Sequence, residues 1–153
     1  MLARLPLLAG CAIALLAGSG TAIAGGAEPV CPGIHVDILG IKNDRGSVAC
    51  ALFESVEGFP TDYLRHATNI VVAKIRDTRA RCEFPDVPPG TYALAVVHDE
   101  NMNGKLDRNR LGVPEEGYGF SNDATGFIGA PSFSAASFRY HGTRLGLTIG
   151  LDY

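Results

Sequence analysis

Apolar and polar residues alternate along several short segments of the chain, a pattern typical of half-buried β-strands. The alternation is clearest near the end, where every second residue of 145–151 is leucine or isoleucine. Strand-like segments also occupy residues 34–39, 47–53, 70–75, 81–84 and 91–98. A shorter one, 138–140, is expected to pair with the last strand across His141 and Gly142. Together they predict an all-β fold, a six- to seven-stranded antiparallel β-sandwich.

One long stretch, residues 99–131, shows neither the two-residue period of a strand nor the 3.6-residue period of a helix. Loops longer than about 15 residues are uncommon in compact domains and are usually functional or disordered. This stretch includes Leu111, Val113, Tyr118, Phe120, Phe127 and Ile128, too many apolar groups for a solvated tail. The sequence therefore predicts one long ordered loop.

The first 24 residues have the three parts of a secretory signal peptide. Arg4 supplies a positive charge, residues 5–17 are almost wholly apolar, and Ala22 and Ala24 are the small residues before a cleavage site. The apolar run is too short for a membrane-spanning helix, which needs roughly 20 residues. We expect cleavage before Gly25 and a periplasmic or secreted protein without a transmembrane segment. Leu8 to Cys11 also resembles a lipoprotein box with Cys11 as the lipidated residue, which stays open as an alternative.

The expected domain organisation follows from this cleavage. Residues 1–24 are the signal peptide, 25–33 an N-terminal extension, and 34–153 a single β-sandwich domain with the loop 99–131. The whole chain has 13 Lys and Arg and 16 Asp and Glu, so losing Arg4 changes the net charge from −3 to −4. No basic stretch remains, which argues against nucleic acid or an anionic membrane as partner.

Three cysteines follow the signal peptide: Cys31, Cys50 and Cys82. An oxidising compartment favours a disulfide. We expect it between Cys50 and Cys82, because both lie in apolar, strand-like segments. The alternative is that these two residues are buried thiols.

The start of the long loop has the spacing of a calcium loop. Counting from Asp99, oxygen-bearing side chains fall at positions one, three, five and nine, which are Asp99, Asn101, Asn103 and Asp107. Gly104 at position six permits a sharp turn, and the carbonyl of Lys105 at position seven adds an oxygen. This is the first part of an EF-hand type of loop, and it predicts bound Ca²⁺.

The loop departs from that pattern at position twelve, where Arg110 replaces a bidentate glutamate. Glu116 is the candidate replacement ligand, with Glu115, Glu100 or water as alternatives. Fewer carboxylates predict weak binding, on the order of 10⁻⁴–10⁻³ M. An ion-free interpretation also stands, because Asp, Asn and Gly form turns that satisfy the backbone without a metal.

The run from His98 to Asp107, followed by the run from Leu111 to Asn122, resembles the bacterial domain-of-unknown-function family 2141. Residues 89–93 upstream and 130–133 downstream fit the same family, and the resemblance covers residues 36–153. It implies an exported β-sandwich similar to transthyretin-like (prealbumin-like) and carboxypeptidase-regulatory-like domains. It implies no established activity and no catalytic residues.

These observations predict an exported non-enzymatic binding or accessory module whose partner is an unknown envelope protein or glycan. One alternative is a hydrolase-type enzyme that uses His98 and nearby carboxylates. It lacks a nucleophile motif, since Ser121 does not stand in a G-x-S-x-G sequence. The other alternative is a purely structural envelope domain without a ligand.

Overall fold

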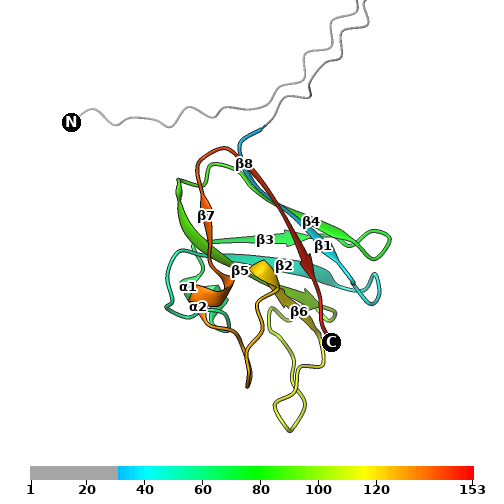
Figure 1. Ribbon diagram of the computed structural model, residues 1–153. Coiled ribbons are helices and arrows are strands. Elements are labelled where there is room, and N and C mark those ends of the chain that lie inside the picture. Colours follow the sequence, from blue (N-terminus) through cyan, green and yellow to red (C-terminus); the bar gives the residue numbers. More distant parts are fainter. Residues whose placement is uncertain (1–30) are drawn as a thin grey trace, which may run out of the picture.

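The computed structural model describes residues 31–153 (Figure 1). The predicted signal peptide, its predicted cleavage site and Cys11 lie outside the described residues. Strands dominate, and the elements follow one another as β1 (Gly33–Leu39), β2 (Ser47–Phe53), α1 (Tyr63–His66), β3 (Asn69–Ala73), β4 (Ala80–Phe84), β5 (Gly90–Asp99), β6 (Gly117–Phe120), η1 (Ser121–Asp123), α2 (Phe133–Ala136), β7 (Phe138–Tyr140) and β8 (Arg144–Gly150).

The strands form two sheets. The smaller sheet has the order β4-β1-β8, and the larger one has the order β3-β2-β5-β6, with β7 paired to the first residues of β5. Their apolar faces meet in a shared core. The predicted all-β sandwich is thus confirmed, with eight strands instead of six or seven in the part of the chain described.

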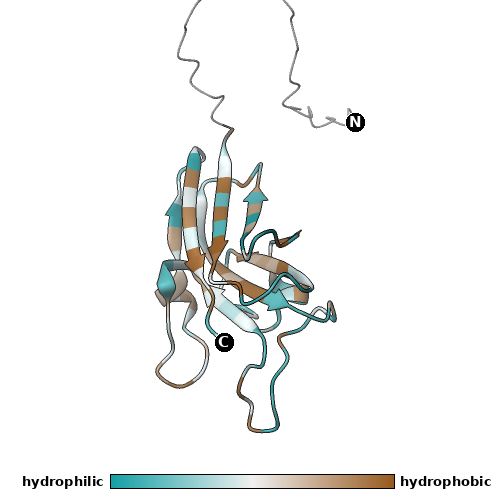
Figure 2. Cartoon of the chain, turned by 90° about the vertical axis from the view of Figure 1, so that its right-hand side faces the viewer, coloured by the Kyte–Doolittle hydropathy of each residue, from teal (hydrophilic) through white to brown (hydrophobic). Residues whose placement is uncertain are grey.

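The core follows directly from the alternation in the sequence. Every second residue of β1, β2 and β5 faces the other sheet, and Val36, Cys50 and Val96 are examples that are fully buried. Figure 2 shows this as apolar and polar bands that alternate along the strands. Burying a side chain of this size stabilises the fold by roughly 1.5–3 kcal/mol.

A second, smaller apolar cluster covers the outer face of the larger sheet. It contains the residues of β2 and β5 that point away from the main core, such as Phe53 and Ala95, together with Tyr63 of α1. Phe59, Phe120 and Phe133 pack against it. Because β2 and β5 are buried on both faces, they read in the sequence as continuous apolar runs.

Cys50 and Cys82 form a disulfide, as predicted. Cys50 lies on β2 and Cys82 on β4, so the bridge joins the two sheets through the core. Both residues are fully buried. The bridge therefore fixes the position of one sheet relative to the other, which the hydrogen bonds within each sheet do not determine.

Two strand pairings differ from the sequence prediction. β7 pairs with β5, and not with the last strand across His141 and Gly142. β8 pairs with β1, and this pair is parallel, so the sandwich is not wholly antiparallel. Consecutive strands commonly pair through a short hairpin. β7 and β8 instead pair with strands distant in sequence, and β8 thereby completes the smaller sheet.

The long loop also contains a strand that the sequence prediction missed. In β6, Tyr118 and Phe120 face outward while Gly117 and Gly119 face inward, so the apolar alternation is hidden by glycine. A Cβ atom on Gly119 would lie 2.4 Å from the carbonyl oxygen of Gly150. Glycine is required because the end of β8 crosses β6 at this distance. Tyr118 and Asp152 then exchange two backbone hydrogen bonds of 2.9 Å.

In residues 31–153 we find no helix with the length and apolar character needed to cross a membrane.

Removing the disulfide tests the dependence of the sandwich on this inter-sheet link. The double variant Cys50→Ala/Cys82→Ala should lose about 3–4 kcal/mol of unfolding free energy, because the bridge spans 32 residues of sequence. Urea unfolding measures the loss. Val56→Ala, at a position that is 71% exposed, is the control and should change stability little. A double variant as stable as the wild type would contradict the prediction.

Candidate functional site

The acidic loop begins where β5 ends, at Asp99. The Asp99 side chain is buried, with 5% of its residue surface exposed, and its two oxygens accept different backbone N–H groups. Oδ1 accepts from Asn103 at 3.0 Å and Oδ2 from Gly104 at 2.7 Å. Gly104 has a φ of +74°, which favours glycine and lets the chain turn back over the carboxylate.

The other predicted loop residues gather beside Asp99. The side-chain oxygen of Asn101 accepts the N–H of Asn103 at 3.0 Å, and that of Asn103 accepts the N–H of Lys105 at 2.9 Å. Both amide nitrogens donate to the Asp107 carboxylate, from Asn101 at 2.6 Å and from Asn103 at 3.0 Å. The structure thus brings positions one, three, five and nine into one hydrogen-bonded network.

Glu116 closes the base of this loop. It lies immediately before β6 and, like Asp99, is only 5% exposed. Its Oε1 accepts the N–H of Glu100 at 2.9 Å and its Oε2 the N–H of Asp107 at 3.0 Å. One carboxylate therefore holds the first and the last part of the acidic loop together.

Tyr63 of α1 supports the loop from the side. Its hydroxyl donates to the carbonyl oxygen of Gly104 at 2.5 Å. Burial raises the pKa of the Tyr63 phenol, and the nearby carboxylates of Asp99 and Glu116 raise it further, since each disfavours a phenolate. The same electrostatics show that the loop presents a negative field toward this side chain.

Glu100, an alternative ligand in the sequence analysis, points elsewhere. Its carboxylate pairs with Arg45 at 2.6 Å and accepts a hydrogen bond from Asn43 at 3.2 Å. Burial raises the pKa of Glu100, but the hydrogen bond from Asn43 and the charge of Arg45 outweigh it and leave this pKa below its ordinary value. Glu100 therefore ties the acidic loop to the turn between β1 and β2.

The oxygens of the loop are hard donors of the kind that calcium prefers. Within residues 31–153, no three or more His, Cys, Asp and Glu side chains are grouped so as to hold a metal ion. An ion in this loop therefore depends on amide and main-chain oxygens besides Asp99 and Asp107. The Lys105 side chain takes no part, and only its backbone belongs to the network.

His98 lies apart from this network, inside the core. It is fully buried, and its Nε2 lies 2.7 Å from the carbonyl oxygen of Arg45, so Nε2 carries the proton and donates. Its Nδ1 accepts from the Tyr153 hydroxyl at 2.7 Å. Nδ1 therefore attaches Tyr153 to β5, and Nε2 attaches the turn between β1 and β2 to the same strand.

Ser121 is engaged in the same way. Its Oγ donates to the carbonyl oxygen of Ala136 at 2.5 Å and accepts the N–H of Leu94 at 2.9 Å. The side chain is buried under α2. It connects the segment after β6 to β5.

A family model matches residues 36–146, a span that contains the acidic loop, Glu116 and both disulfide cysteines. The chain belongs to family DUF2141. The family is described as uncharacterized proteins conserved in bacteria, so membership assigns no activity to the loop. The resemblance seen in the sequence is confirmed. No curated protein and no solved structure matches the chain.

Several residues of this DUF2141 site carry no signal in the sequence. Tyr63 lies in a short helical segment more than thirty residues before Gly104, and Tyr153 lies far beyond His98. Their roles depend on tertiary contacts that no local spacing encodes. The sequence predicts Glu116 as a replacement metal ligand, whereas the structure shows its carboxylate accepting the N–H groups of Glu100 and Asp107.

Neutralising Glu116 tests its function as the closing contact. Glu116→Gln keeps one acceptor but turns an amide N–H₂ toward a backbone N–H, so we expect a loss of about 1–3 kcal/mol in unfolding free energy. Hydrogen exchange should accelerate at the amides of Glu100 and Asp107. Glu115→Gln, the exposed neighbour, is the matched control. Unchanged exchange at both amides would contradict the assignment.

The raised pKa of Tyr63 predicts a pH effect. A phenol whose pKa is higher in the folded state stabilises the fold below the ordinary value of 10.0, and this stability is lost as pH rises through the folded pKa. Tyr63→Phe should cost about 0.5–1.5 kcal/mol at neutral pH through loss of the hydrogen bond to Gly104.

The difference between wild type and Tyr63→Phe should therefore shrink above pH 10.0. Urea unfolding at neutral and alkaline pH measures it. Tyr140→Phe, which removes a hydroxyl from the main core, is the control. A constant difference between wild type and Tyr63→Phe would count against a phenol that faces the loop carboxylates.

Proposed function

We propose that this DUF2141 protein is an exported, non-enzymatic binding or accessory module whose acidic loop, residues 99–107, holds a calcium ion. The observation that supports the proposal is that Asp99, Asn101, Asn103 and Asp107 lie together in one hydrogen-bonded network of the loop. Oxygen donors gathered by a chain that turns at a glycine are what a calcium loop requires.

The chemistry of the donors sets the expected strength of binding. Asp99 and Asp107 bring two carboxylates, and the Asn101 and Asn103 amides bring neutral oxygens. The two amide nitrogens face Asp107, so an ion has to displace these contacts to reach the carboxylate. Arg110 supplies no bidentate ligand at position twelve, which keeps the expected dissociation constant on the order of 10⁻⁴–10⁻³ M. Such affinity suits an extracellular concentration of calcium.

Export is supported by two independent features. Disulfides such as Cys50–Cys82 persist in oxidising compartments and are rare in the cytosol. The N-terminal residues carry the charge, apolar run and small residues of a signal peptide. We therefore assign the mature domain to the periplasm or the exterior of the cell.

Binding is favoured over catalysis by the state of the polar side chains. A nucleophile needs a neighbouring base and access to substrate. His98 and Ser121 are both buried, and their polar atoms make structural hydrogen bonds. The features exposed to a partner are instead two loops that project from one end of the sandwich, residues 99–116 and 124–131 (Figure 1). We place the contact with an envelope protein or glycan there.

Thermal unfolding with calcium tests the ion site. A ligand that binds only the folded state stabilises it by about 2.7 kcal/mol at roughly 100 times its dissociation constant. The midpoint of the mature domain should therefore rise by several degrees between EDTA and saturating calcium.

The double variant Asp99→Asn/Asp107→Asn should lose the rise, whereas Glu115→Gln should keep it. Each variant is compared with itself in EDTA, because Asp99→Asn also weakens the cap on the N–H groups of Asn103 and Gly104. A wild type that gains no stability from calcium would refute the ion site and leave a turn held by its own side chains.

A further inference from the structure

A groove lies on the outer face of the larger sheet, beside the acidic loop but separate from its ion-binding oxygens. It encloses about 820 Å³. Its floor is β5 at Ala95 and Val97, and its walls are the segment 60–64, the loop residues 104–114, the aromatic side of β6, and residues 126–130. The groove is deep because the floor residues are small where the neighbouring walls carry tyrosine, phenylalanine and proline.

The rim is unusually apolar for a surface exposed to water. Leu111 and Ile128 line the groove and are 88% and 90% exposed, and Leu64 and Val113 also line it while more than half exposed. Single exposed apolar side chains are ordinary, but four of them gathered around one concave surface are typical of a binding site. Its volume lies within the range of pockets for small organic ligands, about 300–1,000 Å³.

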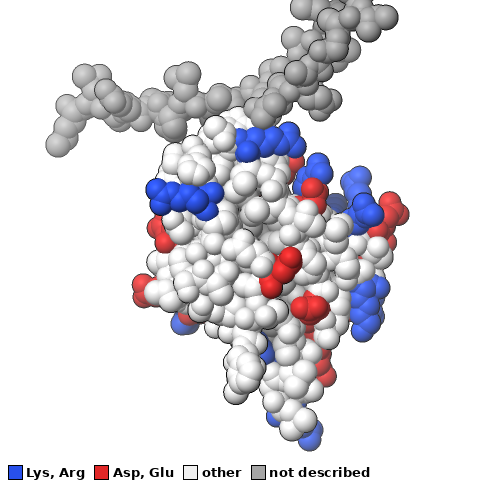
Figure 3. Space-filling model, in the orientation of Figure 1, with Lys and Arg blue, Asp and Glu red and all other residues white. Residues whose placement is uncertain are grey.

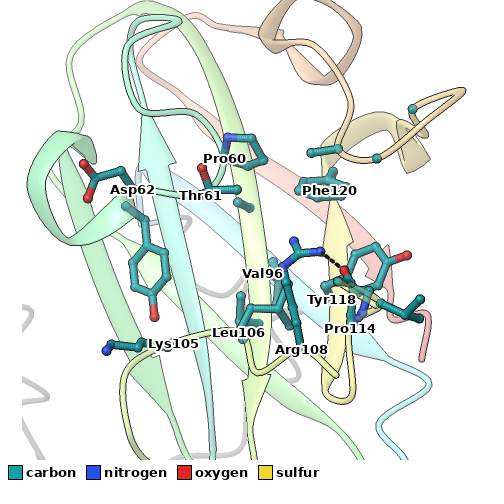
Figure 4. A pocket seen from close by; sticks show the side chains of 18 of the residues that line it. Pro60, Thr61, Asp62, Val96, Lys105, Leu106, Arg108, Pro114, Tyr118 and Phe120 are labelled. Atoms are coloured by element: carbon teal, nitrogen blue, oxygen red, sulfur yellow. Dashed lines mark hydrogen bonds between the residues drawn. The ribbon is translucent and has the colours of Figure 1, made fainter. Parts of the chain in front are cut away.

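One cation reaches into this apolar groove. Figure 4 shows the guanidinium of Arg108 extending between Leu106 and Tyr118, whereas the ammonium of Lys105 points away from it. Arg108 donates through one nitrogen to the carbonyl oxygen of Gly112 at 2.9 Å, and it forms no ion pair with any residue of 31–153. A guanidinium has five N–H donors. Most of them therefore remain available to a ligand.

The segment that carries Arg108 is itself rigidly hydrogen-bonded. Residues 108–114 form a small hairpin in which Asn109 donates to the carbonyl of Val113 at 2.9 Å. The Asn109 side chain accepts the N–H groups of Leu111 and Val113 at 2.9 and 3.1 Å. The hairpin thus holds one cation and two apolar side chains in a fixed arrangement, which lowers the entropy that a ligand would lose on binding.

We propose that this groove binds a small anionic amphiphile, whose apolar body lies on β5 and whose carboxylate-like head pairs with Arg108. The charge sign follows from Arg108, since a planar guanidinium matches a carboxylate or sulfonate with two parallel hydrogen bonds. The apolar body follows from the rim and from the aromatic wall of Tyr118 and Phe120. Figure 3 shows charged side chains of both signs scattered over one face of the domain. Asp62 also lines the groove, but its carboxylate pairs with Arg65 and His66, so Arg108 is the charged group that offers free donors to a ligand.

Two dyes that differ in charge test the proposal. 8-Anilinonaphthalene-1-sulfonate carries the anionic head, and N-phenyl-1-naphthylamine is the same aromatic body without it. The mature protein should bind the sulfonate saturably at one site, and about tenfold more tightly than the neutral dye.

Arg108→Gln should remove the difference between the dyes, and Arg108→Lys should restore part of it. Arg144→Gln, at the start of β8 and outside the groove, is the matched control and should bind both dyes as the wild type does. An equal effect of Arg108→Gln and Arg144→Gln would overturn the assignment of Arg108.

The apolar rim has its own pair of variants. Leu111→Ser/Ile128→Ser should weaken both dyes about tenfold, because both lose apolar contact. Val56→Ser/Val72→Ser removes exposed apolar side chains elsewhere and should weaken neither. Thermal unfolding confirms that each variant is folded, since dye also binds partly folded proteins.

Performing each titration in EDTA and in calcium separates this inference from the ion site. Dye binding that persists without any calcium effect on stability would support the groove and refute the ion. Association with phosphatidylglycerol vesicles in the absence of a saturable dye site would overturn the groove and point to a lipid surface as the partner of the apolar rim.

Discussion

Burial of β5 on both faces is the constraint from which the rest of the structure follows. One face of this strand joins the core between the sheets, and the other lies under α1, Phe59 and Phe120. β2, β6 and β7 all pair with it. A strand in this position is mostly apolar, and its last residue is a carboxylate. Asp99 is buried and requires polar partners, and the acidic loop supplies them with its own N–H groups.

The same logic explains how the loop stays ordered without a regular element. A long connection loses conformational entropy on folding and leaves backbone donors that need acceptors. Asp99 and Glu116 each satisfy two of these donors, and both are nearly buried. Charge-assisted hydrogen bonds of this kind are stronger than neutral ones. The anchored loop then becomes a wall for the groove, so two proposed binding features share one support.

The sequence predicted the elements that depend on local pattern. The alternation in residues 34–39 and 145–151 located β1 and β8, and the apolar settings of Cys50 and Cys82 located the disulfide. It did not predict which strands pair, because partners such as β1 and β8 are chosen by the closure of a sheet. It missed β6 because glycine replaces every second apolar residue there. Within the candidate site, spacing identified the loop residues, whereas Tyr63 and Arg108 take their places only through tertiary contacts.

The parallel pairing of β1 with β8 has a consequence for the order of events during synthesis. β1 is the first described strand and β8 the last, and the smaller sheet needs both. A growing chain therefore holds β1 with only β4 as a partner until its final segment is available, and contacts this distant in sequence form slowly. Completion of the smaller sheet is thereby postponed until β8 has been synthesised. For the exported protein proposed above, which would cross a membrane unfolded, this delay is an advantage built into the topology.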